Sequence, residues 1–215
     1  MSTLYGVYGA GGCGRGIMPL LREQLRGTAA TLVFIDDAAT VDSINGHAVW
    51  PWTRFLEKPA QRRAACLAIA NPRDREQLFD RCAAAGVEII GVRAANAIEM
   101  DDVEIGLGAL ISPFVTLTSN IRIGRCFHAN LYSYVEHDCR IGDFVTFAPG
   151  VHCNGNVHIH DHAYIGTGAV IRQGSPDKPL VIGEGAIVGM GAIVTKDVPA
   201  GVTIVGNPAR PLTKG

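Results

Sequence analysis

A histidine followed directly by an aspartate stands at His137–Asp138, between the apolar Val135 and Cys139. An imidazole can take a proton from a nucleophile, and a carboxylate beside it orients the ring and raises its basicity. A single histidine is more often a solvated surface residue. The pair is therefore a candidate general base with its orienting carboxylate.

A second candidate site is the glycine-rich segment 9–14, Gly-Ala-Gly-Gly-Cys-Gly. It follows an expected strand and opens an expected helix, the setting in which such loops bind phosphate groups. Its spacing only approximates a dinucleotide-binding fingerprint. Asp36, after the second strand, suits ribose hydroxyls or a guanine edge, although Asp36 and Asp37 could equally form a solvated turn.

The elements that position the glycine loop alternate along residues 4–92. We expect strands at 4–8, 31–35, 65–70 and 87–92, and helices at 13–26 and 74–85. Asn71-Pro72 is a plausible helix start. This βαβ pattern predicts a small parallel sheet covered by helices.

The pattern changes at about residue 103, where a repeat of six residues begins. Twelve apolar or small residues recur at this period: Ile105, Ile111, Leu117, Ile123, Ala129, Val135, Ile141, Phe147, Cys153, Ile159, Ile165 and Ile171. After five extra residues within 172–180 the register resumes at Ile182, Val188 and Val194. A second, mostly apolar column lies two residues earlier. Fifteen hexads predict five three-sided coils of 18 residues, a β-helix.

Residues 18 apart occupy equivalent positions on consecutive coils, so Gly155 follows His137. A missing side chain there permits close approach of a substrate, although an ordinary corner glycine is the alternative. Glycines also follow the repeat residue at several corners, where we expect a Cβ to hinder the turn.

Three histidines alternate along one strand, at His158, His160 and His162. This spacing is compatible with a metal site, because alternate side chains share one face of a strand. The hexad register instead turns them outward, and we expect no metal. Trp50-Pro51-Trp52 is interpreted as a short packing loop. The six cysteines have no paired spacing, so we expect free, mostly buried thiols.

The composition narrows the function classes. The net charge is −1 and 18% of residues are charged, which argues against a nucleic-acid partner. No apolar stretch is long enough to span a membrane and no signal peptide is evident, so we expect a cytoplasmic protein without membrane insertion. Glycine is unusually abundant, with 26 residues.

Residues 103–206 resemble the left-handed parallel β-helix of hexapeptide-repeat acyltransferases, and segment 205–209, Val-Gly-Asn-Pro-Ala, resembles that family's closing signature. Together with the glycine loop and Ile35-Asp36-Asp37, the whole chain resembles bacterial nucleotide-sugar N-acetyltransferases that act on 4-amino-4,6-dideoxy sugars. The resemblance implies an α/β Rossmann-like βαβαβ domain over residues 1–98 that binds the nucleotide sugar. It implies a left-handed β-helix acetyltransferase domain over residues 99–215.

The resemblance also implies roles for individual residues. His137 is the general base, Asp138 supports it, and the Gly155 N–H stabilises the oxyanion. The residues that line the acetyl-CoA groove are Thr146, Thr167, Met190 and Gly155. The residues that bind the nucleotide sugar are Gly11, Gly12, Cys13, Asp36, Asp37, Ala70 and Asn71. Acetyl-CoA acts without a metal in a homotrimer whose active sites lie between subunits.

Three readings stay open. The amine of a nucleotide-linked 4-amino sugar attacks acetyl-CoA directly, with GDP-perosamine favoured over a UDP-linked sugar. A relative of the same architecture could instead acetylate a hydroxyl of a sialic-acid-type sugar. A nucleotide-sensing β-helix without catalysis is the third reading, against which the His-Asp pair argues.

Overall fold

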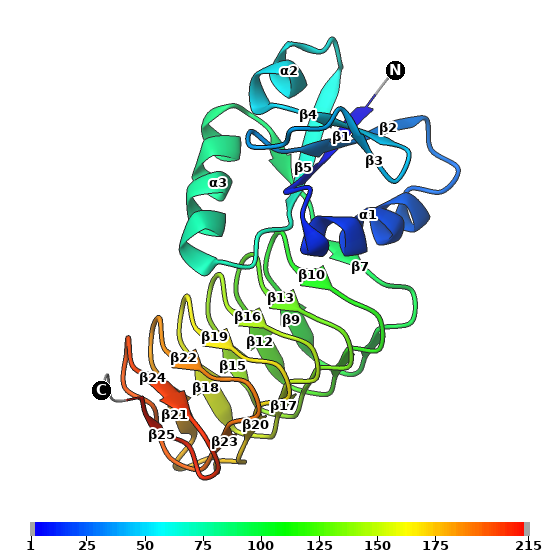
Figure 1. Cartoon of the computed structure of the whole chain (residues 1–215). Helices are drawn as coiled ribbons and strands as arrows, with labels where there is room; N and C mark the ends of the chain where they lie inside the picture. Colours follow the sequence, from blue (N-terminus) through cyan, green and yellow to red (C-terminus); the bar gives the residue numbers. More distant parts are fainter. Residues whose placement is uncertain (1–2, 213–215) are drawn as a thin grey trace. The chain divides into compact units, whose positions relative to one another are not determined.

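The structure is a computed structural model that describes residues 3–212. The chain divides into two compact units between Ala95 and Asn96, three residues before the boundary placed from the sequence (Figure 1). Each unit is described by itself below. None of the helices in residues 3–212 has the length and apolar character needed to cross a bilayer.

The N-terminal unit is a mainly parallel sheet with three helices. Its strands are β1 (Thr3–Tyr8), β2 (Ala30–Ile35), β3 (Ser43–Ile44), β4 (His47–Trp50), β5 (Arg62–Leu67) and β6 (Glu88–Ile89), in the order β3-β4-β2-β1-β5-β6. Its helices are α1 (Gly12–Gln24), α2 (Trp52–Glu57) and α3 (Pro72–Ala84), and a short strand β7 (Val92–Arg93) follows. β1 pairs in parallel with both β2 and β5. The strand order therefore reverses beside β1, which is where open α/β sheets bind ligands at the carboxyl ends of their strands.

Several features of this unit differ from the sequence prediction. The hairpin β3–β4 and helix α2 were not expected, although Asn45-Gly46 has positive φ values of 49° and 79°, as a two-residue hairpin turn requires. The tryptophans of the expected loop instead end β4 and begin α2, and both are buried. β5 ends at Leu67, so Ala70 lies in the connection to α3 rather than at the end of the strand.

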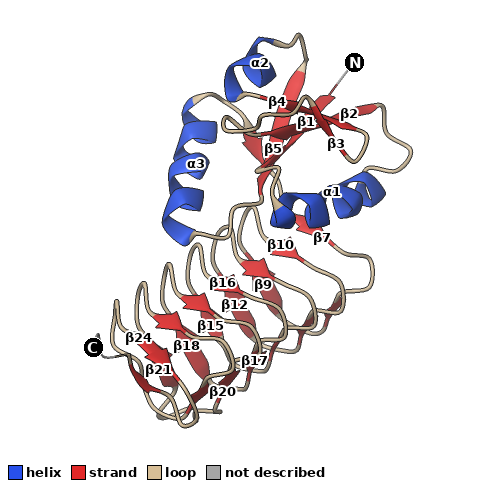
Figure 2. Cartoon of the chain, in the orientation of Figure 1, coloured by secondary structure: helices blue, strands red, loops and turns tan. Residues whose placement is uncertain are grey.

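The C-terminal unit is a parallel β-helix whose short strands stack in three sheets (Figure 2). The first sheet contains β10 (Leu110–Ile111), β13 (His128–Ala129), β16 (Thr146–Phe147), β19 (Tyr164–Ile165), β22 (Ile187–Val188) and β24 (Thr203–Val205), with β25 (Arg210–Pro211) antiparallel at its end. The second contains β8 (Ile98–Glu99), β11 (Thr116–Leu117), β14 (Tyr134–Val135), β17 (His152–Cys153), β20 (Val170–Ile171) and β23 (Ile193–Val194). The third contains β9 (Val103–Ile105), β12 (Ile121–Ile123), β15 (Arg140–Ile141), β18 (Val157–Ile159) and β21 (Leu180–Ile182).

The hexad register is confirmed by the strand pairing. Ile141 pairs with Ile159, 18 residues later, whereas Ile159 pairs with Ile182, 23 residues later. The difference is the five-residue insertion within 172–180. The loop therefore leaves the coil without disturbing the ladder on either side of it.

Both repeat columns fill the interior of the β-helix, where nearly all of their side chains belong to one buried apolar cluster. The polar exception is Ser133, whose hydroxyl donates to the Ala148 carbonyl at 3.0 Å and accepts the Val151 N–H at 3.1 Å. A buried hydroxyl with both functions satisfied costs little. The apolar interior supplies most of the stability of the coils.

The glycines that follow the repeat residue act through close approach of the next coil, not through an unusual φ. A Cβ on Gly166 would lie 2.6 Å from the Met190 nitrogen and 2.7 Å from the Val188 oxygen. Positive φ values occur two residues later, at corner residues such as Phe144 (58°) and His162 (61°). At other corners the residue with positive φ is itself a glycine, such as Gly168 (67°) and Gly191 (65°).

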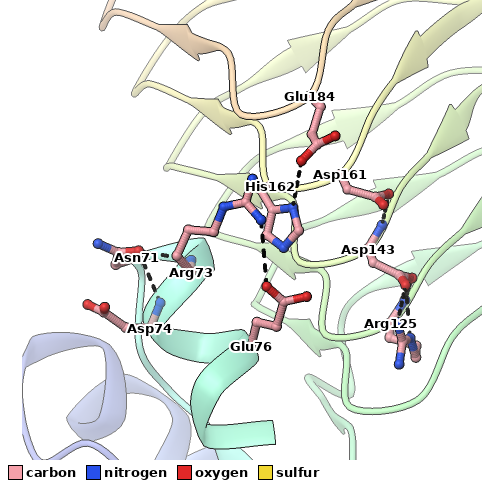
Figure 3. Close-up of polar contacts among 9 residues, drawn as sticks. All are labelled: Asn71, Arg73, Asp74, Glu76, Arg125, Asp143, Asp161, His162 and Glu184. Atoms are coloured by element: carbon pink, nitrogen blue, oxygen red, sulfur yellow. Dashed lines mark hydrogen bonds and ion pairs between the residues drawn. The ribbon is translucent and has the colours of Figure 1, made fainter. Parts of the chain in front are cut away.

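His162, which was expected to point outward with His158 and His160, lies outside the apolar cluster of the β-helix interior but is not exposed to solvent. Its side chain is buried and stacks on Phe144, one coil earlier, with ring centroids 5.5 Å apart, because the corner φ turns both rings into one column. His162 Nδ1 lies 3.8 Å from Glu184 Oε1 (Figure 3).

Beside this ring column a ladder of charged side chains joins successive coils (Figure 3). Asp143 Oδ2 accepts from Arg125 Nε at 2.9 Å, and the Asp143 N–H donates to Asp161 Oδ1 at 2.8 Å. The carboxylates of this corner therefore serve the fold of the β-helix.

Replacing Gly166 by alanine tests this close stacking. The new Cβ meets backbone atoms that cannot move independently, so we expect the free energy of unfolding to fall by about 1–3 kcal/mol. Urea unfolding followed by far-UV circular dichroism measures it. Both tryptophans lie in the N-terminal unit, so their fluorescence reports that unit separately.

Gly16→Ala is the control, because nothing lies within 4 Å of a Cβ added at this position of α1. Its stability should be unchanged or higher by up to about 1 kcal/mol, the difference in helix propensity. An unchanged circular dichroism midpoint for Gly166→Ala contradicts the packing described here.

Candidate active site

His137 lies in the turn between β14 and β15, at the corner between the second and third sheets. Its Nδ1 is 2.7 Å from Asp138 Oδ2. An ionised carboxylate only accepts hydrogen bonds, so Nδ1 carries the proton and Nε2 of the neutral ring is left as the basic nitrogen. The imidazole is 45% exposed, so a substrate can reach it.

Asp138 is held from a second side by Asn120, a residue that the sequence reasoning missed. Asn120 Nδ2 donates to Asp138 Oδ1 at 3.3 Å. The hydrogen bond from His137 holds the pKa of the Asp138 carboxyl below its usual value, and the bond from Asn120 acts in the same direction. Asn120 stands 18 residues before Asp138, so the coil arithmetic could have found it.

Gly155 lies against the histidine ring, one coil later. A Cβ built on Gly155 would be 2.5 Å from His137 Nε2 and 2.6 Å from its Cε1. The Asn156 N–H donates to the His137 carbonyl at 2.9 Å, which fixes the two corners together. The Gly155 N–H has no acceptor within residues 3–212. A basic nitrogen and a free backbone donor thus share one corner, as an acyl transfer to a nucleophile requires.

The three residues expected to bind acetyl-CoA are not brought together at this corner. Thr167 and Met190 occupy equivalent positions on consecutive coils, at the corner between the first and second sheets. Both are exposed, Met190 to 81%. Thr146 lies on β16 and is buried. Within one chain these side chains and His137 belong to different edges of the β-helix.

In the N-terminal unit, the glycine loop and Asp36 meet at the carboxyl edge of the sheet. Gly11 caps α1 and Gly12 is its first residue, and no acidic side chain lies in the first turn of the helix. Asp36 Oδ2 accepts the Ala10 N–H at 3.0 Å, and its Oδ1 accepts the Ala38 N–H at 3.0 Å. Asp36 therefore ties the glycine loop to the end of β2.

Asp37 is fully engaged within the unit. It accepts from the Trp52 N–H at 2.7 Å, from Arg81 Nη1 at 2.7 Å and from the Tyr8 hydroxyl at 3.3 Å. Although burial raises the pKa of Asp37, the hydrogen bonds from Trp52 and Arg81 outweigh it and hold that pKa below its usual value. Burial, followed by the charge of Asp37, raises the pKa of Tyr8. The Asp37 carboxylate thus stabilises the fold of the N-terminal unit by joining α2, α3 and β1.

The other expected substrate residues lie near the connection from β5 to α3. Asn71 caps α3, its Oδ1 accepting the N–H groups of Arg73 at 2.9 Å and Asp74 at 3.3 Å (Figure 3). The carbonyl of Ala70 accepts from the fully buried Arg75 at 3.2 Å. Cys13 lies instead in the first turn of α1. Burial raises the pKa of its thiol, so the thiol stays protonated at neutral pH. Arg75 organises this segment, and nothing in the sequence pattern singled it out.

No group of three or more His, Cys, Asp or Glu side chains with the geometry of a metal site occurs in the part of the chain that the structure describes.

Comparisons with known proteins place these features in context. No family model matches the chain. A curated GDP-perosamine N-acetyltransferase of Escherichia coli O157:H7 is 51% identical over 215 residues, covering 99% of this chain and 97% of the relative. The solved structure of WeeI from Acinetobacter baumannii AYE is 57% identical, with a TM-score of 0.96 over 98% of this chain and 100% of that chain.

The acetyltransferase domain of PglB from Neisseria gonorrhoeae FA1090, solved in complex with acetyl coenzyme A, is 31% identical, with a TM-score of 0.85 over 97% of this chain and 98% of that chain. The parallel β-helix together with the whole-chain similarity to acetyltransferases defines the class, an acyltransferase of the hexapeptide-repeat type. The chain belongs to the GDP-perosamine N-acetyltransferase family.

Replacing Asp37 by alanine separates its structural use from a role in binding. We expect the N-terminal unit to lose about 1–2 kcal/mol of unfolding free energy, because Trp52, Arg81 and Tyr8 each lose an acceptor that is partly exposed to solvent. Tryptophan fluorescence during urea unfolding measures it, since Trp52 stacks on Tyr8 with centroids 5.5 Å apart.

The pKa of Asp37 is lower in the folded chain than in the unfolded one. Its contribution is therefore present above the unfolded-state pKa and disappears as the pH falls through the folded-state pKa, so the two proteins should converge in acid. Asp42→Ala, at an exposed position of the same unit, should change stability by less than about 0.5 kcal/mol. Equal stability of Asp37→Ala and wild type at neutral pH overturns the structural role.

Proposed function

We propose that this chain transfers the acetyl group of acetyl-CoA to the 4-amino group of a nucleotide-linked 4-amino-4,6-dideoxy sugar, with GDP-perosamine as the favoured substrate. The single observation that carries the chemistry is the contact of the His137 ring with Gly155, beside Asp138. The family named above supports the choice of donor and acceptor.

The reaction is direct attack within a ternary complex. The sugar amine attacks the thioester carbonyl carbon while His137 Nε2 accepts a proton from the amine nitrogen. Asp138 stabilises the imidazolium that forms, and Asn120 holds Asp138 in place. The Gly155 N–H donates to the oxyanion of the tetrahedral intermediate. Collapse breaks the C–S bond, and the imidazolium returns its proton to the CoA sulfur, so no acyl-enzyme forms.

The N-terminal unit is proposed to be a Rossmann-like nucleotide-sugar domain. Its glycine loop presents the first N–H groups of α1, and an open helix N-terminus suits a diphosphate. In the proposal Gly11, Gly12 and Cys13 line this loop, and Asp36 and Asp37 lie on the nucleoside side. Ala70 and Asn71 lie nearby in the connection from β5 to α3. The side chains of Asp37 and Asn71 already make hydrogen bonds within the unit. We therefore propose that these two residues shape the site and do not bind the substrate through a free side chain.

A homotrimer of left-handed β-helices in the cytoplasm completes the proposal. Thr167 and Met190 stand on a different edge of the coil from His137, and Thr146 is on a different sheet. A groove for acetyl-CoA that uses all four residues therefore needs two chains. The exposed Met190 side chain is available to line such a seam.

His137→Asn tests the proposed base. Asparagine keeps the polar character but cannot take the proton, so we expect kcat to fall by about 10²–10⁴-fold. Thiol release from acetyl-CoA in the presence of GDP-perosamine measures the rate, and calorimetric titration with CoA should give an unchanged Kd. His160→Asn, at an exposed histidine of the third sheet's edge, is the matched control and should retain the wild-type rate.

The same thiol-release assay separates the remaining readings. Turnover with UDP-linked 4-amino sugars but not with GDP-perosamine moves the proposal to a uridine nucleotide. Turnover only with sugar hydroxyls makes the enzyme an O-acetyltransferase. Near-wild-type turnover by His137→Asn refutes its assignment as the base, and CoA binding without any turnover favours a binding protein.

A further inference from the structure

The peptide bond between Asn154 and Gly155 carries the N–H that the proposed reaction uses, and its carbonyl oxygen is held from inside the β-helix. Cys139 Sγ lies 3.3 Å from the Asn154 carbonyl oxygen, and Cys153 Sγ lies 3.8 Å from the same atom. Both cysteines are free and fully buried. The shorter contact therefore comes from Cys139, a residue that the mechanism above does not use.

The geometry of one peptide unit links this carbonyl to the Gly155 N–H. A peptide unit is planar and trans, so its C=O and N–H groups point in opposite directions. Cys139 belongs to the apolar cluster of the interior. An Asn154 carbonyl that points towards this thiol therefore turns the Gly155 N–H away from the interior, where no acceptor within residues 3–212 occupies it.

Cys139 also holds the other end of the same corner. The Val157 N–H donates to Cys139 Sγ at 3.4 Å. A thiol is both a weak donor and a weak acceptor, so this one side chain bridges residues 154 and 157 from the preceding coil. The corner that contains Gly155 is therefore fixed at both ends before a substrate binds. Such preorganisation makes a backbone donor effective towards an oxyanion.

A second residue of the same interior column makes the same pair of contacts. Ser133 donates to the carbonyl 15 residues further on, that of Ala148, and accepts the N–H 18 residues further on, that of Val151. Cys139 makes its two contacts at the same separations. The other residues of this column between Val103 and Ala169 are apolar. Stacking of the coils therefore does not by itself require a donor at this position.

The remaining contacts of the corner do not fix this peptide unit. The Tyr134 hydroxyl donates to Asn154 Oδ1 at 2.8 Å, and Asn154 Nδ2 donates to the Ile171 carbonyl at 2.8 Å, so both hold the asparagine side chain. The Gly174 N–H donates to the Gly155 carbonyl, which belongs to the next peptide unit. In residues 3–212 the two thiols are the donors to the Asn154 carbonyl.

We propose that Cys139 is a positioning residue for the acetyl transfer. Its thiol donates to the Asn154 carbonyl and so holds the Gly155 N–H in the orientation that meets the oxyanion of the tetrahedral intermediate. The inference deepens the proposed function and rests on it. Cys139 touches neither substrate and forms no covalent bond. Loss of its contact therefore lowers kcat and leaves the affinity for CoA unchanged.

Cys139→Ala and Cys139→Ser are the matched pair that tests this role, because alanine and serine have nearly the same volume and differ in one hydroxyl group. We expect kcat of Cys139→Ala to fall roughly tenfold or more, since removing a whole oxyanion donor costs about 10²–10³-fold and this variant only misplaces one. Cys139→Ser should stay within about threefold of the wild type, since Ser133 already makes this pair of contacts. Thiol release from acetyl-CoA in the presence of GDP-perosamine measures both rates.

Cys126→Ala is the control for the loss of a buried thiol. Cys126 is also fully buried in the β-helix, but it lies at the corner between β12 and β13, away from the Gly155 corner. Its kcat should equal that of the wild type. Calorimetric titration should give the wild-type Kd for CoA in all three variants. The pH profile of kcat/KM should also be unchanged in Cys139→Ala, because the His137–Asp138 pair is intact.

The S–H stretching band in the infrared spectrum supplies a readout that needs no turnover. The difference between the wild type and Cys139→Ser should contain an S–H band at lower frequency than that of a free thiol, because donation to a carbonyl weakens the S–H bond. A thiolate gives no such band, so its presence also shows that Cys139 is protonated.

A wild-type kcat for Cys139→Ala overturns the inference. An equal loss of kcat in Cys139→Ala and Cys139→Ser also overturns it, because the loss then comes from packing, and so does the absence of a shifted S–H band. These outcomes are separable from failure of the proposed function. An active wild type with an equally active Cys139→Ala refutes only the inference, whereas a wild type that acetylates no sugar refutes the function and the role of Cys139 with it.

Discussion

The spacing of stacked coils is the constraint on which the rest of the β-helix depends. Because strands of adjacent coils lie about 4.8 Å apart, side chains 18 residues apart in the sequence become neighbours in space. This spacing puts apolar residues on apolar residues in the interior and permits no Cβ at Gly166. It also sets His137 against Gly155 and Asn120 beside Asp138, so the site is assembled by the same repeat that builds the fold.

The insertion loop shows how this rule accommodates a departure from the repeat. The third sheet resumes its ladder after the loop, with Ile159 on Ile182. The loop is tied to the Gly155 corner and carries the cationic side chains of Arg172 and Lys178. A rigid repeat can thus support a polar segment at one edge. The N-terminal unit places its polar groups differently, at the carboxyl ends of β1, β2 and β5.

The sequence predicted the β-helix well because each hexad repeats one physical requirement, an apolar residue facing the interior. The hairpin β3–β4 was missed because its strands are two and four residues long and only Asn45-Gly46 signals the turn. The burial of His162 was not predicted because the hexad register predicts strand faces, whereas the stacking of this corner ring on Phe144 joins two coils. The engagement of Asp37 by Arg81 depends on a contact between residues 44 apart, which no local pattern encodes.

The most direct test of the account is the turnover of Gly155→Ala. The three atoms nearest to the added methyl group all belong to the movable His137 ring, and Gly155 needs no positive φ, so the protein should fold with little loss of stability. Because the ring must leave its place beside the Gly155 N–H, we expect kcat to fall by about 100-fold or more. A wild-type kcat for this variant would contradict the claim that the contact between His137 and Gly155 forms the catalytic site.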